Sequence, residues 1–127
     1  MSSTDLNQIL ELSGEERFDY FLSEVVEERE LWILVNADNR FLKIESQDDS
    51  VAYLPVWPSA DFALAYAQGS SELKPKSLSL PEFFQKWVPG LTRDGIEVGV
   101  FPGSDGTLWI TEPADLKQDL QDDVFNR

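Results

Sequence analysis

The side chains that could do chemistry are limited by two absences, because the sequence contains no histidine and no cysteine. Zinc sites built on those residues, thiol nucleophiles and Ser-His or Cys-His arrangements are therefore excluded. Catalysis would have to use carboxylates, lysine, tyrosine, serine or threonine, or a hard cation held by oxygen ligands. With 24 acidic residues, no catalytic carboxylate pair stands out without knowledge of their spacing. The sequence predicts no catalytic residue and no cofactor, and it favours a non-enzymatic role.

One stretch resembles an oxygen-ligand metal loop, with Asn36, Asp38, Asp48 and Asp49 as donors. The calcium-binding EF-hand pattern also requires an acceptor where Arg40 stands and a glycine where Phe41 stands. A hairpin turn explains the same letters. The sequence therefore predicts no metal site.

The net charge of −14 is concentrated at the two ends of the chain. Residues 1–30 hold nine acidic residues against two arginines, and residues 112–127 hold five against two basic residues. This field repels phosphate backbones, so we expect neither nucleic-acid nor membrane binding. The acidic residues either form a solvated face or a docking surface for a basic protein partner, with Glu24, Glu27 and Glu28 as its candidate residues.

A second candidate site lies at the junction that contains Trp57 and Pro58. A stiff backbone there could hold the indole partly exposed to a ligand, with Tyr53 and a nearby loop arginine, Arg93, as polar groups. The competing interpretations place Trp57 in the core and make Arg93 a surface ion-pair partner. On the first interpretation, the protein is a small-molecule-binding protein or a hydrolase with a pocket near Trp57.

The elements that would position these residues follow from periodicity and capping. Capping boxes at Ser13 and Ser79 predict two helix starts, and the second helix is expected to end at Pro89 and Gly90. An alanine-rich helix follows Pro58, residues 70–76 read as a polar loop, and Leu116, Leu120 and Val124 mark a last helix. Strands are predicted at residues 31–35, 41–45, 51–56, 96–101 and 107–110.

These elements predict one domain over residues 1–127, with acidic helical ends at residues 1–30 and 112–127. Strands grouped between helices, without strict alternation, indicate an α+β fold with a mostly antiparallel sheet of about five strands covered by helices in a single layer pair. Pro55 lacks an N–H, so we expect it at the edge or the end of its strand. We expect a monomer or a homodimer.

Four sequence features occur together and in the same order along the chain. They are Trp32, L-P-V-W-P at residues 54–58, W-V-P-G-L at residues 87–91 and D-G-I-E-V-x-V-F-P at residues 94–102. In this combination the chain resembles the bacterial Domain of Unknown Function 2750 family over about residues 18–116. The resemblance implies a small bacterial cytoplasmic α+β protein without an assigned reaction. It transfers no catalytic residue.

The sequence lacks a signal-peptide pattern and any apolar run near the roughly 18 residues that cross a bilayer, so we expect a cytoplasmic protein. The absence of cysteine fits a reducing compartment. The leading hypothesis is a non-enzymatic protein-interaction module with an acidic surface.

Overall fold

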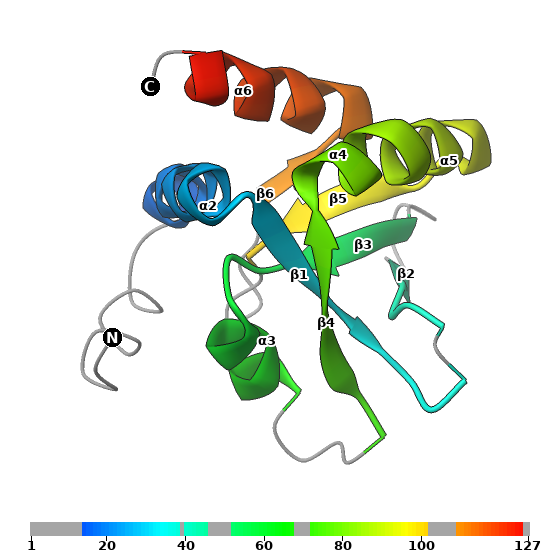
Figure 1. The fold of residues 1–127 in the computed structure, drawn as a ribbon. Coiled ribbons are helices and arrows are strands. Elements are labelled where there is room, and N and C mark those ends of the chain that lie inside the picture. Colours follow the sequence, from blue (N-terminus) through cyan, green and yellow to red (C-terminus); the bar gives the residue numbers. More distant parts are fainter. Residues whose placement is uncertain (1–13, 39, 46–51, 68–71, 102–108, 126–127) are drawn as a thin grey trace.

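The computed structural model describes residues 14–38, 40–45, 52–67, 72–101 and 109–125 (Figure 1). Within them, the helices are α2 (Gly14–Glu28), α3 (Ala60–Tyr66), α4 (Leu80–Glu82), the π-helical turn η1 (Phe83–Trp87), α5 (Val88–Asp94) and α6 (Pro113–Phe125). The strands are β1 (Glu30–Val35), β2 (Ile44–Glu45), β3 (Ala52–Val56), β4 (Lys74–Ser79), β5 (Glu97–Val100) and β6 (Trp109–Thr111). Helices and sheets together confirm the α+β class. The predicted cap at Ser13 lies outside the described residues.

The strands form two small sheets, so the prediction of a single, mostly antiparallel sheet of about five strands was wrong. Strand β1 pairs with β4, and the second sheet has the order β2-β3-β5-β6. Its β3–β5 pair is parallel, with Tyr53 opposite Glu97 and Val56 opposite Val100. Parallel strands need a long crossover, here the chain through α3, β4 and the helices up to α5. Hydrophobic alternation does not specify which strands are partners, and this is why the crossover was missed.

Strand β4 occupies part of the segment that was predicted to be a polar loop. Its sequence is K-P-K-S-L-S, and Leu78 is its buried residue. The strand pairs along its whole length with β1, from Glu30 opposite Ser79 to Val35 opposite Lys74. Because one face of the strand is open to solvent, its polar letters were read as a loop.

Asn36 makes the turn that follows β1, as the hairpin interpretation expects. Its Oδ1 atom accepts hydrogen bonds from the N–H of Asp38 at 2.9 Å and of Arg40 at 3.0 Å. The predicted return strand is shorter than expected, because Phe41 forms a single bridge to Val35 before β2 begins to pair with β3. The side-chain carbonyl of Asn36 therefore serves the turn, in the manner of an Asx-turn.

Backbone hydrogen bonds between two tryptophans join the sheets. The Trp32 N–H donates to the Trp57 carbonyl and the Trp57 N–H donates to the Trp32 carbonyl, both at 2.9 Å. Consecutive residues of a strand direct their backbone groups to opposite sides, so Tyr53, Pro55 and Trp57 direct theirs to the same side of β3, where β2 lies beside Tyr53 and β1 beside Trp57. Pro55 lies between these neighbours, where no described strand is opposite it on that side. Its missing N–H therefore leaves no unpaired donor.

The helix that starts at Ser79 runs further than predicted. The Ser79 Oγ accepts from the Glu82 N–H at 3.3 Å, which confirms the predicted cap. The helix does not end at Pro89 but passes through η1 into α5, where the Val88 N–H donates to the Phe83 carbonyl five residues back. Such a π turn widens the helix just before the proline, whose ring would clash with the carbonyl four residues earlier in a regular helix. The helix instead ends with Asp94, and Gly95 caps it with φ +71°.

A hydrophobic core gathers side chains from both sheets and from the helices that flank them. Helix α6 contacts both α2 and α5, whereas α3 lies away from α6, against β1 and β4 (Figure 1). The largest fully buried side chains include Trp57, Phe21, Phe62, Phe83 and Phe101, together with Leu116 and Leu120 of the acidic α6. Both described acidic helices therefore contribute their apolar residues to the core. Within the described residues, no helix is both long and apolar enough to cross a lipid bilayer.

Leu120→Ala should lower the free energy of unfolding by about 2–5 kcal/mol, because it leaves a cavity where a fully buried side chain stood. Urea unfolding followed by tryptophan fluorescence measures this change. The control Asp115→Ala, at an exposed position of the same helix, should change it by less than about 0.5 kcal/mol. Two equally small effects would show that α6 does not contribute to the core.

Candidate functional site

The first candidate site is a hollow of about 300 Å³ between α2, the start of β1 and the junction that leads into α3. We call it the acidic hollow, and it is lined by Tyr20, Glu24, Glu28, Glu30, Trp32, Pro58, Ser59, Ala60, Asp61 and Phe62. Four of these side chains are carboxylates, and three are aromatic. The hollow therefore combines negative charge with aromatic walls.

Helix and strand periodicity place these side chains on one side. Tyr20, Glu24 and Glu28 are four residues apart, so they follow one another along one face of α2. Glu30 and Trp32 are two residues apart in β1, so they share a face of that strand. The backbone bonds between Trp32 and Trp57 then bring the next residue, Pro58, beside that face.

Three of the seven residues proposed from the sequence, Glu24, Glu28 and Pro58, meet in the acidic hollow. Glu27, on the neighbouring part of α2, is exposed and is not one of its lining residues. Trp57 is only 1% exposed and its ring contacts that of Tyr66 at a centroid distance of 5.1 Å. The core interpretation of Trp57 therefore describes its position, and the partly exposed indole does not occur.

Tyr53 and Arg93 lie elsewhere. Arg93 is part of α5 rather than of a loop, and its Nε lies 3.6 Å from a carboxylate oxygen of Asp94, with 80% of its side chain exposed. Helix α5 leads into β5 at the end where Glu97 pairs with Tyr53, whereas Trp57 follows the opposite end of β3. The expected placement of Arg93 beside Trp57 is therefore wrong, and the surface ion-pair interpretation fits its position.

The environment of Tyr53 makes its hydroxyl harder to ionise. Burial, with a smaller contribution from Tyr66, raises its pKa above the ordinary value of 10.0. A catalytic tyrosine needs a lowered pKa to act as a base near neutral pH. The direction of the shift thus fits a structural role for Tyr53.

Sequence reasoning missed Tyr20, Glu30, Trp32 and Asp61 as lining residues of the acidic hollow. The four-residue spacing of Tyr20, Glu24 and Glu28 was a signal that could have found Tyr20. No local pattern could have found Asp61, because it reaches the hollow only through the turn between β3 and α3. Within the described residues, no group of three or more acidic side chains has the arrangement of a metal site.

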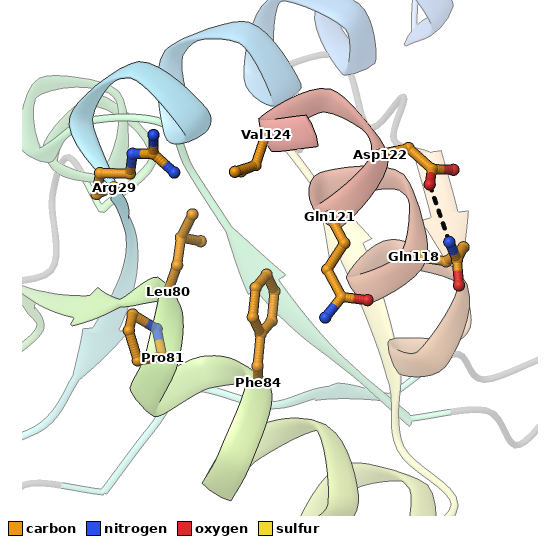
Figure 2. Close-up of a pocket in the computed structure, with 8 residues that line it drawn as sticks. All are labelled: Arg29, Leu80, Pro81, Phe84, Gln118, Gln121, Asp122 and Val124. Atoms are coloured by element: carbon orange, nitrogen blue, oxygen red, sulfur yellow. Dashed lines mark hydrogen bonds between the residues drawn. The ribbon is translucent and has the colours of Figure 1, made fainter. Parts of the chain in front are cut away.

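A second and larger hollow, which we call the apolar groove, was also missed (Figure 2). It encloses about 690 Å³ between the end of α2, the start of α4 and the C-terminal half of α6. Its apolar lining consists of Leu80, Pro81, Phe84 and Val124. Its polar lining consists of Arg29, Gln118, Gln121 and Asp122. The groove draws on three distant segments, so no single stretch of sequence predicts it.

Arg29 separates the two hollows. It follows the last residue of α2 and has φ +61°, in the left-handed region that glycine favours. This turn directs the chain from α2 into β1, and Glu28 and Glu30 line the acidic hollow while Arg29 lines the apolar groove. One turn thus presents opposite charges to two different sites.

Helix α6 has a row of like charges beside the apolar groove. Asp115, Asp119 and Asp122 are four and three residues apart, so they lie near one another on the helix surface. Partial burial, and then the charges of Asp115 and Asp122, raise the pKa of Asp119 above its ordinary value. Ionised Asp119 is therefore less favoured in the folded protein than in the unfolded chain.

These features define a small α+β fold in which helices flank two short sheets, with an acidic hollow on one side of the α2–β1 turn and an apolar groove on the other. The family model described as Protein of unknown function (DUF2750) matches residues 18–120, and the chain belongs to that family. The match confirms the resemblance drawn from the motifs. No match to the chain is found among curated proteins.

Asp119→Asn should raise the unfolding temperature at neutral pH by about 1–3 °C, because it removes repulsion from two neighbouring carboxylates. A raised folded-state pKa means that wild-type stability is gained as the pH falls through that value, and the gain is complete below the unfolded pKa near 3.8. The advantage of the variant should therefore shrink in acid. Thermal unfolding across pH measures it, with the exposed Asp38→Asn as a control of equal charge change. An equal benefit from both variants would contradict the local explanation.

Proposed function

We propose that the protein is a non-enzymatic, cytoplasmic interaction module that receives a lysine or arginine side chain of a protein partner in the acidic hollow. The observation that carries this proposal is the convergence of Glu24, Glu28, Glu30 and Asp61 with aromatic side chains around one hollow. This proposal keeps the acidic docking surface expected from the sequence. It assigns that surface to a defined place between α2, β1 and α3.

The chemistry of the hollow suits an organic cation. Carboxylates accept charge-assisted hydrogen bonds from ammonium and guanidinium groups, and the faces of Tyr20 and Trp32 attract a cation held against them. Both rings are half-buried, so they are fixed in place while part of each remains accessible. Within the described part of the chain, no salt bridge joins the four carboxylates to a basic side chain. Their charge is available to a partner.

The charge of the whole protein supports the same partner. A net charge of −14 attracts basic surfaces over a distance and raises the rate of encounter with them. Glu27 is exposed on α2 near this face, where a rim charge acts mainly on association rate. The absence of cysteine agrees with a reducing compartment such as the cytoplasm.

A small-molecule ligand is the second candidate for the same place. A volume of about 300 Å³ lies at the lower end of the range for ligand pockets. The original form of this hypothesis used Trp57, Tyr53 and Arg93, and none of the three is among the lining residues of the acidic hollow. A free organic cation is the version that the lining supports.

Glu24→Gln combined with Glu28→Gln should weaken the binding of a short lysine-containing peptide by at least about tenfold, since two charge-assisted contacts are lost. Chemical-shift titration of the full chain measures the affinity, and the acetyl-lysine form of the peptide should not bind. The matched control, Glu15→Gln with Asp19→Asn, removes the same charge from exposed positions of α2 and should change affinity less than about threefold.

Equal losses in both double variants would mean that only the overall charge matters, and this result would refute a site. A peptide that shifts no resonance of the hollow would refute it as well. Equal affinity for free butylammonium and for the peptide would favour the small-molecule candidate.

A further inference from the structure

The apolar groove is lined by one positively charged residue, Arg29, and the backbone conformation of this residue is unfavourable for an arginine. Arg29 takes φ +61° at the position after a helix where glycine is the usual residue. A side chain in this region is strained, and glycine would avoid most of that strain. The conformation is held by hydrogen bonds from the Arg29 N–H to the Val25 carbonyl at 2.8 Å and from the Leu80 N–H to the Arg29 carbonyl at 3.1 Å. The second bond ties Arg29 directly to the groove wall.

The guanidinium of Arg29 projects into the space between Leu80 and Val124 (Figure 2). The one carboxylate that lines the groove, Asp122, lies on its far side and accepts a hydrogen bond from Gln118 Nε2 at 2.9 Å. Among the described residues, no carboxylate forms a salt bridge with Arg29. The groove therefore offers a positive charge that the described side chains do not neutralise.

The rest of the lining selects what could neutralise this charge. Leu80, Pro81, Phe84 and Val124 form apolar walls beside the guanidinium, and about 690 Å³ lies within the range of ligand pockets. Guanidinium binds carboxylates in a bidentate manner. Because the protein carries a net charge of −14, a ligand with several negative charges would be repelled. A ligand with a single carboxylate and an apolar hydrocarbon part would pair with the guanidinium, fit the apolar walls and carry little charge for the acidic protein to repel.

We propose that the apolar groove binds an apolar monocarboxylic acid, with its carboxylate on Arg29 and its hydrocarbon chain along Leu80, Phe84 and Val124. Gln121 lines the groove from α6, beside Phe84 and across from Arg29 (Figure 2). This site is separate from the acidic hollow, and it uses residues of the opposite charge.

Decanoate is the probe, titrated into the full chain below its micelle concentration and followed by amide NMR. We expect saturable binding with shifts centred on Arg29, Leu80, Phe84 and Val124. Decanol, which lacks the charge, should bind at least about tenfold more weakly, and decyltrimethylammonium should not bind in this groove. Absence of decanoate binding, or shifts centred elsewhere, would overturn the proposal.

Arg29→Gly is the decisive variant, because it removes the guanidinium and also relieves the backbone strain. It should keep the fold while decanoate affinity falls at least about tenfold. Arg29→Lys should retain part of the affinity, and Arg93→Gln, which removes the same charge from an exposed position outside the groove, should leave it unchanged. Equal affinity in wild type and Arg29→Gly would refute the site. Loss of lysine-peptide binding in the hollow variants has no bearing on this result, so the two proposals fail independently.

Discussion

The paired backbone hydrogen bonds between Trp32 and Trp57 are the constraint on which the arrangement depends. They connect the β1–β4 sheet to the end of β3, and so to the four-stranded sheet. Because Trp57 is almost fully buried, its indole fills the core at the same point where its backbone joins the sheets. The acidic hollow follows from this junction, since Pro58 and Asp61 reach α2 only when β1 and β3 are held together.

The turn at Arg29 is the second organising feature, because it decides what each side of the α2–β1 connection presents. The acidic residues before and after it line the hollow, and the arginine itself lines the groove. A protein with a strongly negative charge thus keeps one of its few positive groups beside an apolar surface. Residual backbone strain at a binding site is a recurrent property of functional residues. Here the strain and the cation coincide in one residue.

Capping residues and helical spacing predicted several of the individual elements correctly, but they could not predict which distant strands pair with one another. The cap at Ser79 was correct because it involves groups only three residues apart. The buried positions Leu116 and Leu120 also followed from helical spacing. The parallel β3–β5 pair and the polar strand β4 were missed, because partner choice depends on the whole chain. For the same reason, Glu24 and Glu28 were proposed from charge alone, whereas their meeting with Pro58 required the fold.

The parallel pair has a consequence for how the chain matures during translation. Strand β3 leaves the ribosome well before β5, since α3, β4 and the helices up to α5 are made between them. Until then, the side of β3 that will receive β5 is an uncovered template for wrong partners. Non-local pairings of this kind form late and slow the acquisition of structure. The nascent chain therefore passes through a period in which the β5-facing side of β3 is unpaired. On the opposite side of β3, which faces β2 and β1, Pro55 cannot donate a hydrogen bond and so limits wrong pairing there.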